Sequence, residues 1–560
     1  MHATTQSKTD NITFPVPWDI PFDDGEPFMH DPMHMPFAIS PLTGSMMAEA
    51  SGTGMTVAAA ETGIPIAAYD TRERNYYHFT RIAPVIPTSE EHAREIGEVA
   101  EAAGKREVGR QMERWHGEHL PRLQELNARL ATLLTTDASD SEILAALDEA
   151  KAIAIEVWTI HFRLAIPMLL SMQLFDEFYA DLFGGTDADG HALLVGGVSE
   201  SVKAGFGISD LAAIAREQGL AQEIIATPAE ALLPALERSE AGRAFLAALR
   251  DYLAEYGLRQ DLFDLAIPTW QEDPSFALAT VRAYLISGRD ARAEHAAMAT
   301  SADTALAAAR EQLAVYPEAV RNQFEAMLQF ARQGAFLQEE HNFYIDQRNT
   351  ALIRLLALRA GRMMVQRGWL QEPDDIFLLK LEELRDILRG GPDRSGDAVR
   401  ALVDRRRREL AQAAEMTPPP FIGRPPSGPP PASNPIERGM LRFFGGPPQV
   451  SETPGQLKGT PGSRGATTGI ARVARTLEEA QALEPGEILV AITTMPPWTP
   501  LFGIASAVVT ETGGPLSHCA IVAREYGIPA VVGAAGATQV IQTGQEITVD
   551  GSGGLVTYAA

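Results

Sequence analysis

The pattern of hydrophobic and polar positions divides the chain into zones. Between residues 90 and 415, apolar side chains recur every three or four positions in Ala-, Leu-, Glu- and Arg-rich segments such as 142–183 and 302–369. This spacing predicts amphipathic helices separated by Pro and Gly-Asp-type breaks. Residues 1–90 show little helical period and many Pro, Met and aromatic residues, so we expect irregular extended chain with short strands there, for example over 75–85.

The last hundred residues alternate between short β-type runs and short helical pieces, which predicts a compact α/β domain over 457–560. The β-type runs are 470–474, 487–492, 507–510, 530–533, 546–550 and 555–558, and the main helical pieces are 477–483 and 517–526. The fold class predicted for the whole chain is therefore multidomain: a mainly α-helical domain with a small irregular or β N-terminal part, followed by a C-terminal α/β domain.

A proline-rich segment joins the two larger zones. Eleven of the 38 prolines fall in residues 416–450. Such a run is poorly suited to a helix or a central strand and favours extended polyproline II. We interpret 416–456 as a linker, either a passive spacer or a semi-rigid arm that lets the last domain move. The predicted divisions are thus 1–90, 90–415, 416–456 and 457–560.

Composition excludes several classes of function. The 47 basic and 73 acidic residues give a net charge of −26, which disfavours non-specific binding to nucleic acid or to an anionic membrane. The single cysteine, Cys519, cannot form a disulfide within one chain. The N-terminus lacks the apolar region of a secretory signal, and the most apolar stretch, 165–175, is too short to span a bilayer. We expect a soluble, cytoplasmic protein.

The segment 510–533 carries the clearest chemistry. Gly513 and Gly514 allow a tight turn with room for a bulky group, Ser517 can cap the helix that follows, and His518 falls in the first turn of that helix. A helix start favours phosphate, and imidazole is nucleophilic near neutral pH. These features fit a histidine that carries a phosphoryl group, although an isolated histidine at such a place is more often a surface or capping residue.

This segment resembles the phosphohistidine swivelling domain of PEP-utilising enzymes, a family that includes phosphoenolpyruvate synthase, pyruvate phosphate dikinase and rifampicin phosphotransferase. The family pattern Thr-x-x-Gly-Gly-x-x-Ser-His is present from Thr510 to His518, and Ala-Ile-Val-Ala-Arg-Glu follows at 520–525. The resemblance covers 457–560. It implies that His518 is the phosphorylated residue and that Thr510, Gly513, Gly514 and Ser517 surround the phosphoryl group.

Weaker resemblances lie outside that domain. Residues 14–47 and 75–87 look like the start, and residues 348–388 like the last helices, of the acceptor-binding domain of rifampicin phosphotransferase. Phenol- and cresol-phosphorylating systems related to phenylphosphate synthase share this layout. We see neither an ATP-grasp domain nor a Walker-type motif, and the chain ends about 40 residues after His518, where the pyruvate enzymes continue into a barrel.

The resemblance implies a subunit of a two-component phosphotransferase. A separate ATP-grasp partner, which would bind most of the ATP and Mg²⁺, would transfer a phosphoryl group to His518 and release AMP and phosphate. This chain would then pass that group to a hydroxyl of an apolar, phenolic small molecule. Two alternatives remain open: a component of a rifamycin-type antibiotic phosphotransferase, or a non-enzymatic phosphocarrier or regulatory protein.

The helical zone offers candidates for the acceptor site. In the polar helix predicted over 336–362, His341 could be the general base, Tyr344 could contact the acceptor, and Arg348 or Arg354 could bind the phosphate. A solvated charged face with i,i+4 pairs is the simpler interpretation of the same pattern.

The N-terminal zone holds a second candidate. His30 and His34 could line the acceptor pocket, although loop packing is the simpler reading and a third metal ligand is not obvious. We therefore predict no metal site in this chain.

Overall fold

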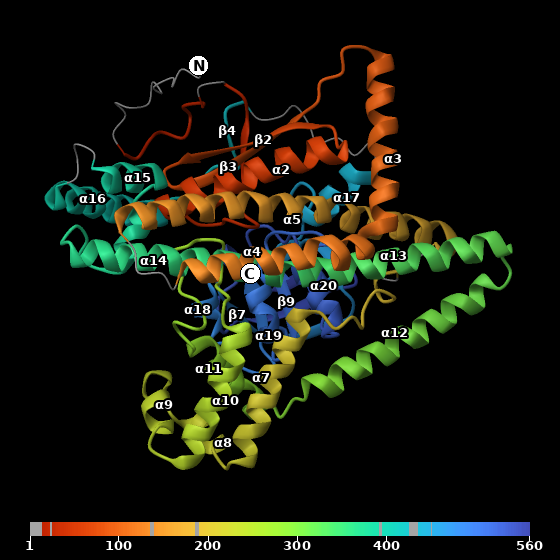
Figure 1. Cartoon of the computed structure of the whole chain (residues 1–560). Coiled ribbons are helices and arrows are strands. Elements are labelled where there is room, and N and C mark those ends of the chain that lie inside the picture. Colours follow the sequence, from red (N-terminus) through yellow and green to blue (C-terminus); the bar gives the residue numbers. More distant parts are fainter. Residues whose placement is uncertain are drawn as a thin grey trace.

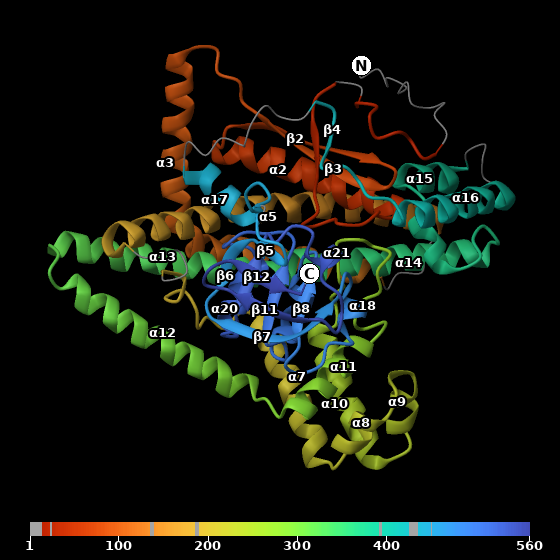
Figure 2. The same cartoon turned by 180° about the vertical axis from the view of Figure 1, so that it is seen from behind.

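The computed structural model describes residues 14–22, 25–134, 139–184, 190–390, 395–424, 435–449 and 451–559. It confirms the predicted fold class: a helical body carries a small N-terminal sheet and contacts a C-terminal α/β domain. In Figures 1 and 2 this C-terminal domain lies between the layer of α13 and α14 and the lobe formed by α7 to α11. The phosphohistidine segment is therefore packed against the helical body.

Helix α5 (Asp140–Phe183) is the central element of the body. It begins with a capping box between Ser139 and Glu142 and packs against α2 (Glu49–Thr62) and α13 (Glu318–Asn342). An apolar window of this helix is long enough to cross a membrane, contrary to the expectation from 165–175 alone. Because 67% of that window is buried inside the fold, it is typical of a core helix.

The other helices surround α5 and form the lobe below it (Figure 1). In chain order they are α1 (Pro41–Thr43), α3 (Glu90–Arg114), α4 (Leu120–Leu133), α7 (Glu200–Glu217), α8 (Ala221–Ala226), α9 (Ala229–Leu236), α10 (Glu240–Tyr256), α11 (Ser275–Ser287), α12 (Ala291–Leu313), α14 (Thr350–Gln366), α15 (Leu381–Arg389) and α16 (Gly396–Ala414). Four further segments interrupt or join these helices: the π-helical segments η1 (Gly44–Ala48), η2 (Trp115–His119) and η3 (Phe343–Asn349), and the 3-10 helix η4 (Pro373–Leu378).

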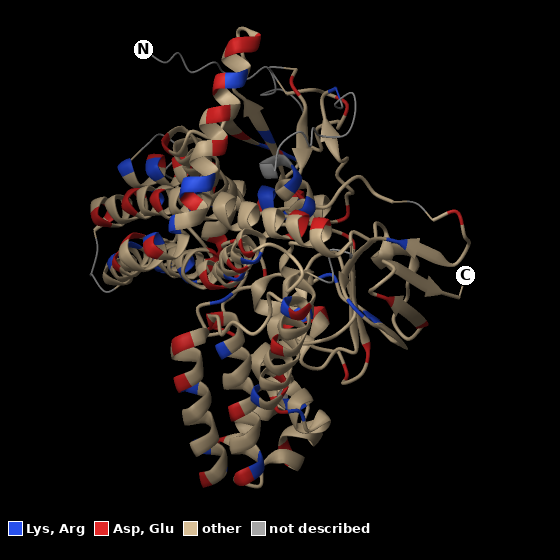
Figure 3. Cartoon of the chain, turned by 90° about the vertical axis from the view of Figure 1, so that its right-hand side faces the viewer, with Lys and Arg blue, Asp and Glu red and all other residues tan. Residues whose placement is uncertain are grey.

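Charged side chains of both signs are interspersed along these helices (Figure 3). Many form pairs between neighbouring helices, such as Arg122 with Glu156 and Arg129 with Glu149. These exposed pairs contribute little to stability individually. The excess of acidic residues is therefore spread over the molecule.

The N-terminal zone is more regular than its composition indicates. Its sheet has the order β2-β3-β1-β4, formed by β1 (Phe28–His30), β2 (Ile66–Arg74), β3 (Tyr77–Pro84) and β4 (Phe421–Ile422). Strand β3 confirms the expectation for 75–85. The expectation of little helix was wrong, because residues 41–62 are helical throughout.

Strand β4 and helix α17 (Pro435–Phe444) both lie in the predicted proline-rich linker. Strand β4 pairs antiparallel with β1, at the edge of the sheet, and α17 packs against α5. The expectation of extended polyproline II was therefore wrong for 435–444. Pro435 stands at the first position of α17, where a missing N–H costs nothing, and Arg438 of α17 pairs with Glu177 of α5. Residues 425–434 lie outside the described part of the chain.

The C-terminal domain is built on an eight-stranded sheet of order β5-β12-β11-β7-β8-β9-β10-β6, with parallel pairing from β7 to β10. Its strands are β5 (Gln456–Lys458), β6 (Thr460–Ser463), β7 (Ala466–Val473), β8 (Ile488–Ala491), β9 (Ala507–Thr510), β10 (Ala530–Val532), β11 (Glu546–Asp550) and β12 (Leu555–Tyr558). Its helices are α18 (Leu477–Ala480), η5 (Pro496–Trp498), α19 (Thr499–Phe502), α20 (His518–Glu525) and α21 (Ala537–Val540). All six predicted β-type runs correspond to strands.

Candidate functional site

His518 is the first residue of α20, which follows the loop after the parallel strand β9. The carboxyl ends of parallel strands are a common place for ligand sites in α/β sheets. Here that edge faces α13 of the helical body, and the His518 Nδ1 atom lies 2.9 Å from Oε1 of Glu339. Only 8% of His518 is exposed. The structure therefore shows the histidine docked against the helical body.

The contact with Glu339 fixes the chemistry of the imidazole ring. A carboxylate oxygen can only accept, so Nδ1 carries a proton, and in the neutral ring Nε2 then holds the lone pair. Nε2 is buried and has no hydrogen-bond partner among the described residues. Glu339 would also stabilise positive charge that develops on the ring. His518 thus presents Nε2 as a nucleophile that can accept a phosphoryl group.

The predicted phosphate-binding residues of this loop differ in the hydrogen bonds and packing contacts that they make. The Thr510 hydroxyl donates to the carbonyl of Thr512, and the Gly514 amide donates to the carbonyl of Phe443 at the end of α17. Gly513 has a φ of +89°, which requires the conformational freedom of glycine. A side chain at Gly514 would collide with the carbonyl of Arg442, so the room expected there for a bulky group is occupied by α17.

Ser517 occupies the N-cap position of α20 with extended backbone, as the sequence suggests, but makes no side-chain capping bond. Its hydroxyl is buried and unpartnered among the described residues. Of the predicted phosphate-binding side chains in the loop, the Ser517 hydroxyl is thus the one left able to bind a ligand in this state.

Arg259, in the loop between α10 and α11, is a residue that the sequence analysis missed. It is fully buried, and its three guanidinium nitrogens have no hydrogen-bond partner among the described residues. The guanidinium lies 5.4 Å from the ring centre of Phe343 and 5.7 Å from that of Trp270. Burial lowers the pKa of Arg259, while the charge of Glu339 acts in the opposite direction. A buried arginine without hydrogen-bond partners among the described residues is suited to bind an anionic group.

The two arginines selected from the sequence are placed differently. Arg354 is buried and makes a bidentate salt bridge with Glu272, and its remaining nitrogen donates to the carbonyl of Leu265. These bonds occupy its donors, which favours a structural role in this state. Arg348 is half-buried and stacks over the ring of Phe343 at 5.4 Å. Neither arginine contacts His518 in the described hydrogen bonds.

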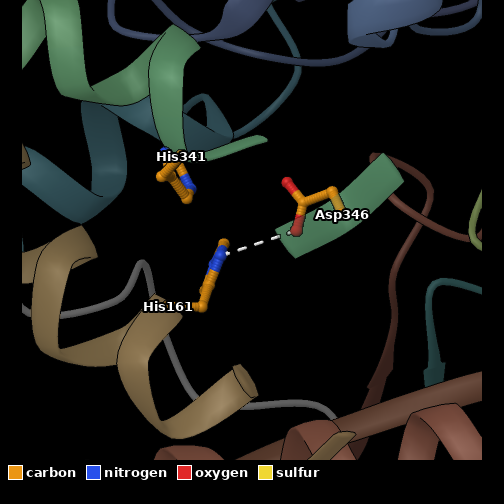
Figure 4. A group of neighbouring side chains, drawn as sticks. All are labelled: His161, His341 and Asp346. Atoms are coloured by element: carbon orange, nitrogen blue, oxygen red, sulfur yellow. Dashed lines mark ion pairs between the residues drawn. The ribbon is translucent and has the colours of Figure 1, made fainter. Parts of the chain in front are cut away.

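His341 lies in a buried cluster with His161 of α5 and Asp346 of η3 (Figure 4). Burial lowers the pKa of His341 to about 4 and raises that of Asp346 to about 8. The charge of Glu339, the residue that binds His518, acts on both groups. The alternative of a solvated charged face is wrong for His341, of which 1% is exposed.

The predicted acceptor-binding residues have different surroundings. Tyr344 is half-buried, with its ring against Trp115 and Phe343. His34 pairs with Asp31 at 2.9 Å and exerts a charge effect on Asp346. His30 is buried in the N-terminal sheet against Tyr77 and Phe79. His34 is thus the nearer of the two histidines to the cluster.

A cavity of about 350 Å³ opens between α20 and the helical body. Leu194, Val202 and Phe336 supply apolar walls, and Glu339 and Glu525 supply carboxylates. His30, His34 and Tyr344 are not among the described residues that line it. Because Glu339 also binds His518, an apolar molecule in this cavity would lie close to the histidine.

Further contacts hold the C-terminal domain in this position. Asp261 accepts hydrogen bonds from the Trp498 indole at 2.5 Å and from the Leu477 amide at 2.7 Å. Glu525 accepts one from the amide of Gly196 at 3.1 Å. These carboxylates join the helical body to the C-terminal domain, so the docked arrangement is specifically bonded.

Comparison with known families confirms the resemblance seen in the sequence. Residues 483–554 match the family of the mobile domain of PEP-utilising enzymes, and residues 161–339 match the fourth domain of rifampicin phosphotransferase. The chain therefore joins a mobile domain of the PEP-utilising type to a helical domain of the rifampicin phosphotransferase type. His518 and Glu339 fall in these two matched regions.

Three curated relatives extend the comparison. The chain is 35% identical over 557 residues to chondramide synthase cmdD of Chondromyces crocatus, which covers 97% of this chain and 14% of that protein. It is 29% identical over 440 residues to the uncharacterized phosphotransferase YvkC of Bacillus subtilis (77% of this chain, 51% of that protein). It is 30% identical over 364 residues to rifampicin phosphotransferase of Streptomyces sviceus (63% and 39%). The chain thus spans about half or less of each relative.

Proposed function

We propose that the chain is the acceptor-binding and phosphohistidine-carrying part of a phosphotransferase. His518 accepts a phosphoryl group derived from ATP and passes it to a hydroxyl of an apolar, phenolic small molecule. The products are the phosphoester, AMP and phosphate. The observation that carries this proposal is the His518 ring, whose Nδ1 is held by Glu339 while Nε2 stays unpartnered at the domain boundary.

The geometry supports a specific division of roles. During transfer the acceptor oxygen forms a bond to phosphorus as the bond between phosphorus and Nε2 breaks, and the ring regains its lone pair. Arg259 would stabilise the charge on the phosphoryl oxygens, while the 350 Å³ cavity would hold the apolar part of the acceptor. Oε1 of Glu339 holds His518, but its Oε2 has no hydrogen-bond partner among the described residues, so this second oxygen can take the proton of the hydroxyl.

We further propose that the ATP step takes place outside these 560 residues, on a separate ATP-grasp partner that binds most of the ATP and Mg²⁺, in the cytoplasm. The relatives in the comparison are longer than this chain, which supports a further nucleotide-binding part. The C-terminal domain would then leave its docked position to be loaded. Residues 445–455, between α17 and β5, could act as its tether and reach about 36 Å when extended.

A second candidate function shares the same chemistry with another acceptor. The match of residues 161–339 to a rifampicin phosphotransferase domain favours a rifamycin-type acceptor. The similarity to a chondramide synthase shows that this architecture also occurs in a protein named for a different product. An acceptor screen therefore has to include both phenols and rifamycins.

The test uses a chemical phosphoryl donor, so that no partner is needed. The purified chain is treated with potassium phosphoramidate, and the phosphorylated residue is mapped by mass spectrometry. We expect an acid-labile phosphohistidine at His518, its loss in His518→Ala, and transfer to one of phenol, p-cresol or rifampicin. Glu339→Gln should slow transfer. Glu340→Gln serves as the matched control, because Glu340 is the adjacent residue on α13.

Phosphate mapped to a residue other than His518 would overturn the proposed function. A stable phosphohistidine that no hydroxyl compound discharges would favour the phosphocarrier alternative. Equal transfer rates in Glu339→Gln and Glu340→Gln would remove Glu339 from the mechanism and leave His518 in place.

A further inference from the structure

Three potential metal-ligand atoms that lack hydrogen-bond partners among the described residues converge between α5, α13 and η3. They are Nδ1 of His161 on α5, Nε2 of His341 on α13 and Oδ1 of Asp346 on η3, and all lie within 4.8 Å of one another (Figure 4). Each is buried and makes no hydrogen bond to any described residue. His161 and Asp346 form an ion pair of 3.6 Å, the dashed line in Figure 4, and this separation is too long for a hydrogen bond.

Such an arrangement is costly without a ligand. Each buried polar atom that finds no partner costs on the order of 1–3 kcal/mol. Three of them in one place, contributed by three different elements, require something that satisfies all of them together. One cation would do so, because every one of these atoms can donate a lone pair.

The tautomer of His341 suits metal binding. Its Nδ1 lies 2.7 Å from the carbonyl oxygen of Leu337, which can only accept, so Nδ1 carries the proton and Nε2 keeps the lone pair. Metal-bound histidines usually donate their second ring nitrogen to a carbonyl or carboxylate in this way. Asp346 lies in a π-helical segment, a local form of helix that is frequent at functional sites.

We propose that His161, His341 and Asp346 form a binding site for one divalent transition-metal ion. Two imidazole nitrogens and one carboxylate oxygen suit Zn²⁺, Fe²⁺ or Mn²⁺ better than Ca²⁺ or Mg²⁺, which prefer oxygen ligands. Ligand atoms bound at about 2.1 Å in a tetrahedral site are about 3.4 Å apart, so a pair that now lies as much as 4.8 Å apart has to close by up to about 1.4 Å on binding. Side-chain rotations of His161 and Asp346 would have to supply this change.

The site would leave at least one coordination position open. Such a position can bind an oxygen ligand and lower the pKa of its proton. If the proposed function holds, the hydroxyl of the acceptor is a suitable ligand, because Glu339 lies near both the cluster and His518. The metal site itself does not depend on that function.

The experiment measures metal binding directly on the untagged, full-length chain. After treatment with chelator, the protein is titrated with Zn²⁺ by calorimetry and with Co²⁺ by visible absorption, and bound metal is counted after dialysis. We expect one ion per chain, a Co²⁺ spectrum of a nitrogen and oxygen site, and a rise in unfolding temperature with added Zn²⁺. Mg²⁺ should not compete at equal concentration.

Variants test the assignment of the ligands. His341→Ala and Asp346→Asn should each weaken Zn²⁺ binding by at least about 100-fold, more than is usually caused by the loss of a group that only hydrogen-bonds to a ligand. His116→Ala, on the exposed side of η2, should bind as the wild type does. Circular dichroism of each metal-free variant shows whether it is folded, and His161→Asn provides a third ligand variant of smaller volume change.

Two results would overturn the site: no Zn²⁺ retained by the wild type, or undiminished affinity in folded ligand variants. Either outcome can occur with phosphoryl transfer intact, in which case His341 would be available as a general base without metal. Intact metal binding with no phosphohistidine at His518 would instead contradict the proposed function alone.

Discussion

At the scale of single residues, the sequence was most informative where chemistry and spacing coincide. His518 could be predicted because glycines, a cap position and a helix start lie within nine residues of one motif. Glu339 and Arg259 could not, because they reach the site from parts of the chain that are 179 and 259 residues away from His518. Their signal is the lack of partners in a buried place, which appears only once the fold is formed.

Arg259 offers a prediction with opposite effects on stability and on activity. Replacing a buried, unpaired charge by an apolar side chain of similar length removes a desolvation cost, so Arg259→Met should raise stability by roughly 1–4 kcal/mol. The same change removes a cation from the phosphoryl group and should slow transfer by about 10²–10³-fold. Calorimetry and the acceptor screen measure the two effects on one protein.

The control for this prediction is Arg354→Met. Arg354 is paired with Glu272, so its loss should lower stability. A stabilised Arg259→Met that transfers at the wild-type rate would show that Arg259 has no part in the reaction. A destabilised Arg259→Met would show that its guanidinium is compensated in the folded chain.

At the scale of elements, the strands and long helices followed from periodicity, but two features did not. Helix α2 was missed because Gly52 and Gly54 weaken its helical signal. The structure shows why they are there: a side chain at Gly54 would lie 2.8 Å from the backbone of Trp158 and Thr159 in α5. The second feature is the π-helical segment η3, which contains Tyr344 and Arg348 and interrupts the regular period of the helix predicted over 336–362.

Helix α2 therefore gives a prediction about packing. Gly54→Ala should lower the unfolding free energy by about 1–3 kcal/mol or more, because the methyl group forces α2 away from α5. Gly97→Ala is the matched change in α3, where nothing lies within 4 Å of the added methyl group, and it should raise helix stability by up to about 1 kcal/mol. Denaturant titrations of the two variants should show opposite signs, and equal shifts would contradict the close-packing explanation.

At the scale of the whole molecule, the structure shows the C-terminal domain docked on the helical body, and under the proposed function this is one of two positions that the domain visits. The docked position is held by carboxylates that become buried at the boundary. Burial raises the pKa of Glu525 to about 8 and that of Asp261 to about 6. Both groups therefore take up protons when the domain docks, which couples docking to pH.

Docking should accordingly weaken as the pH rises. The ordinary pKa of Glu525 is 4.5, and its pKa in the docked state is about 8. Its favourable contribution to docking is fully present below pH 4.5. The contribution decreases as the carboxyl group of the undocked state ionises, and it is lost above about pH 8. Arg524, Glu339 and His295 face this group, and Arg524 opposes the rise in its pKa.

Glu525→Gln should remain docked at pH 8. The docking equilibrium of the wild type should weaken relative to this variant by up to about tenfold per pH unit as the pH rises. Exposed Glu546→Gln is the control. Energy transfer between dyes on α16 and the C-terminal domain, attached at engineered cysteines because Cys519 is buried, measures the docked fraction. A docked fraction that is constant from pH 5 to pH 9 would contradict the coupling.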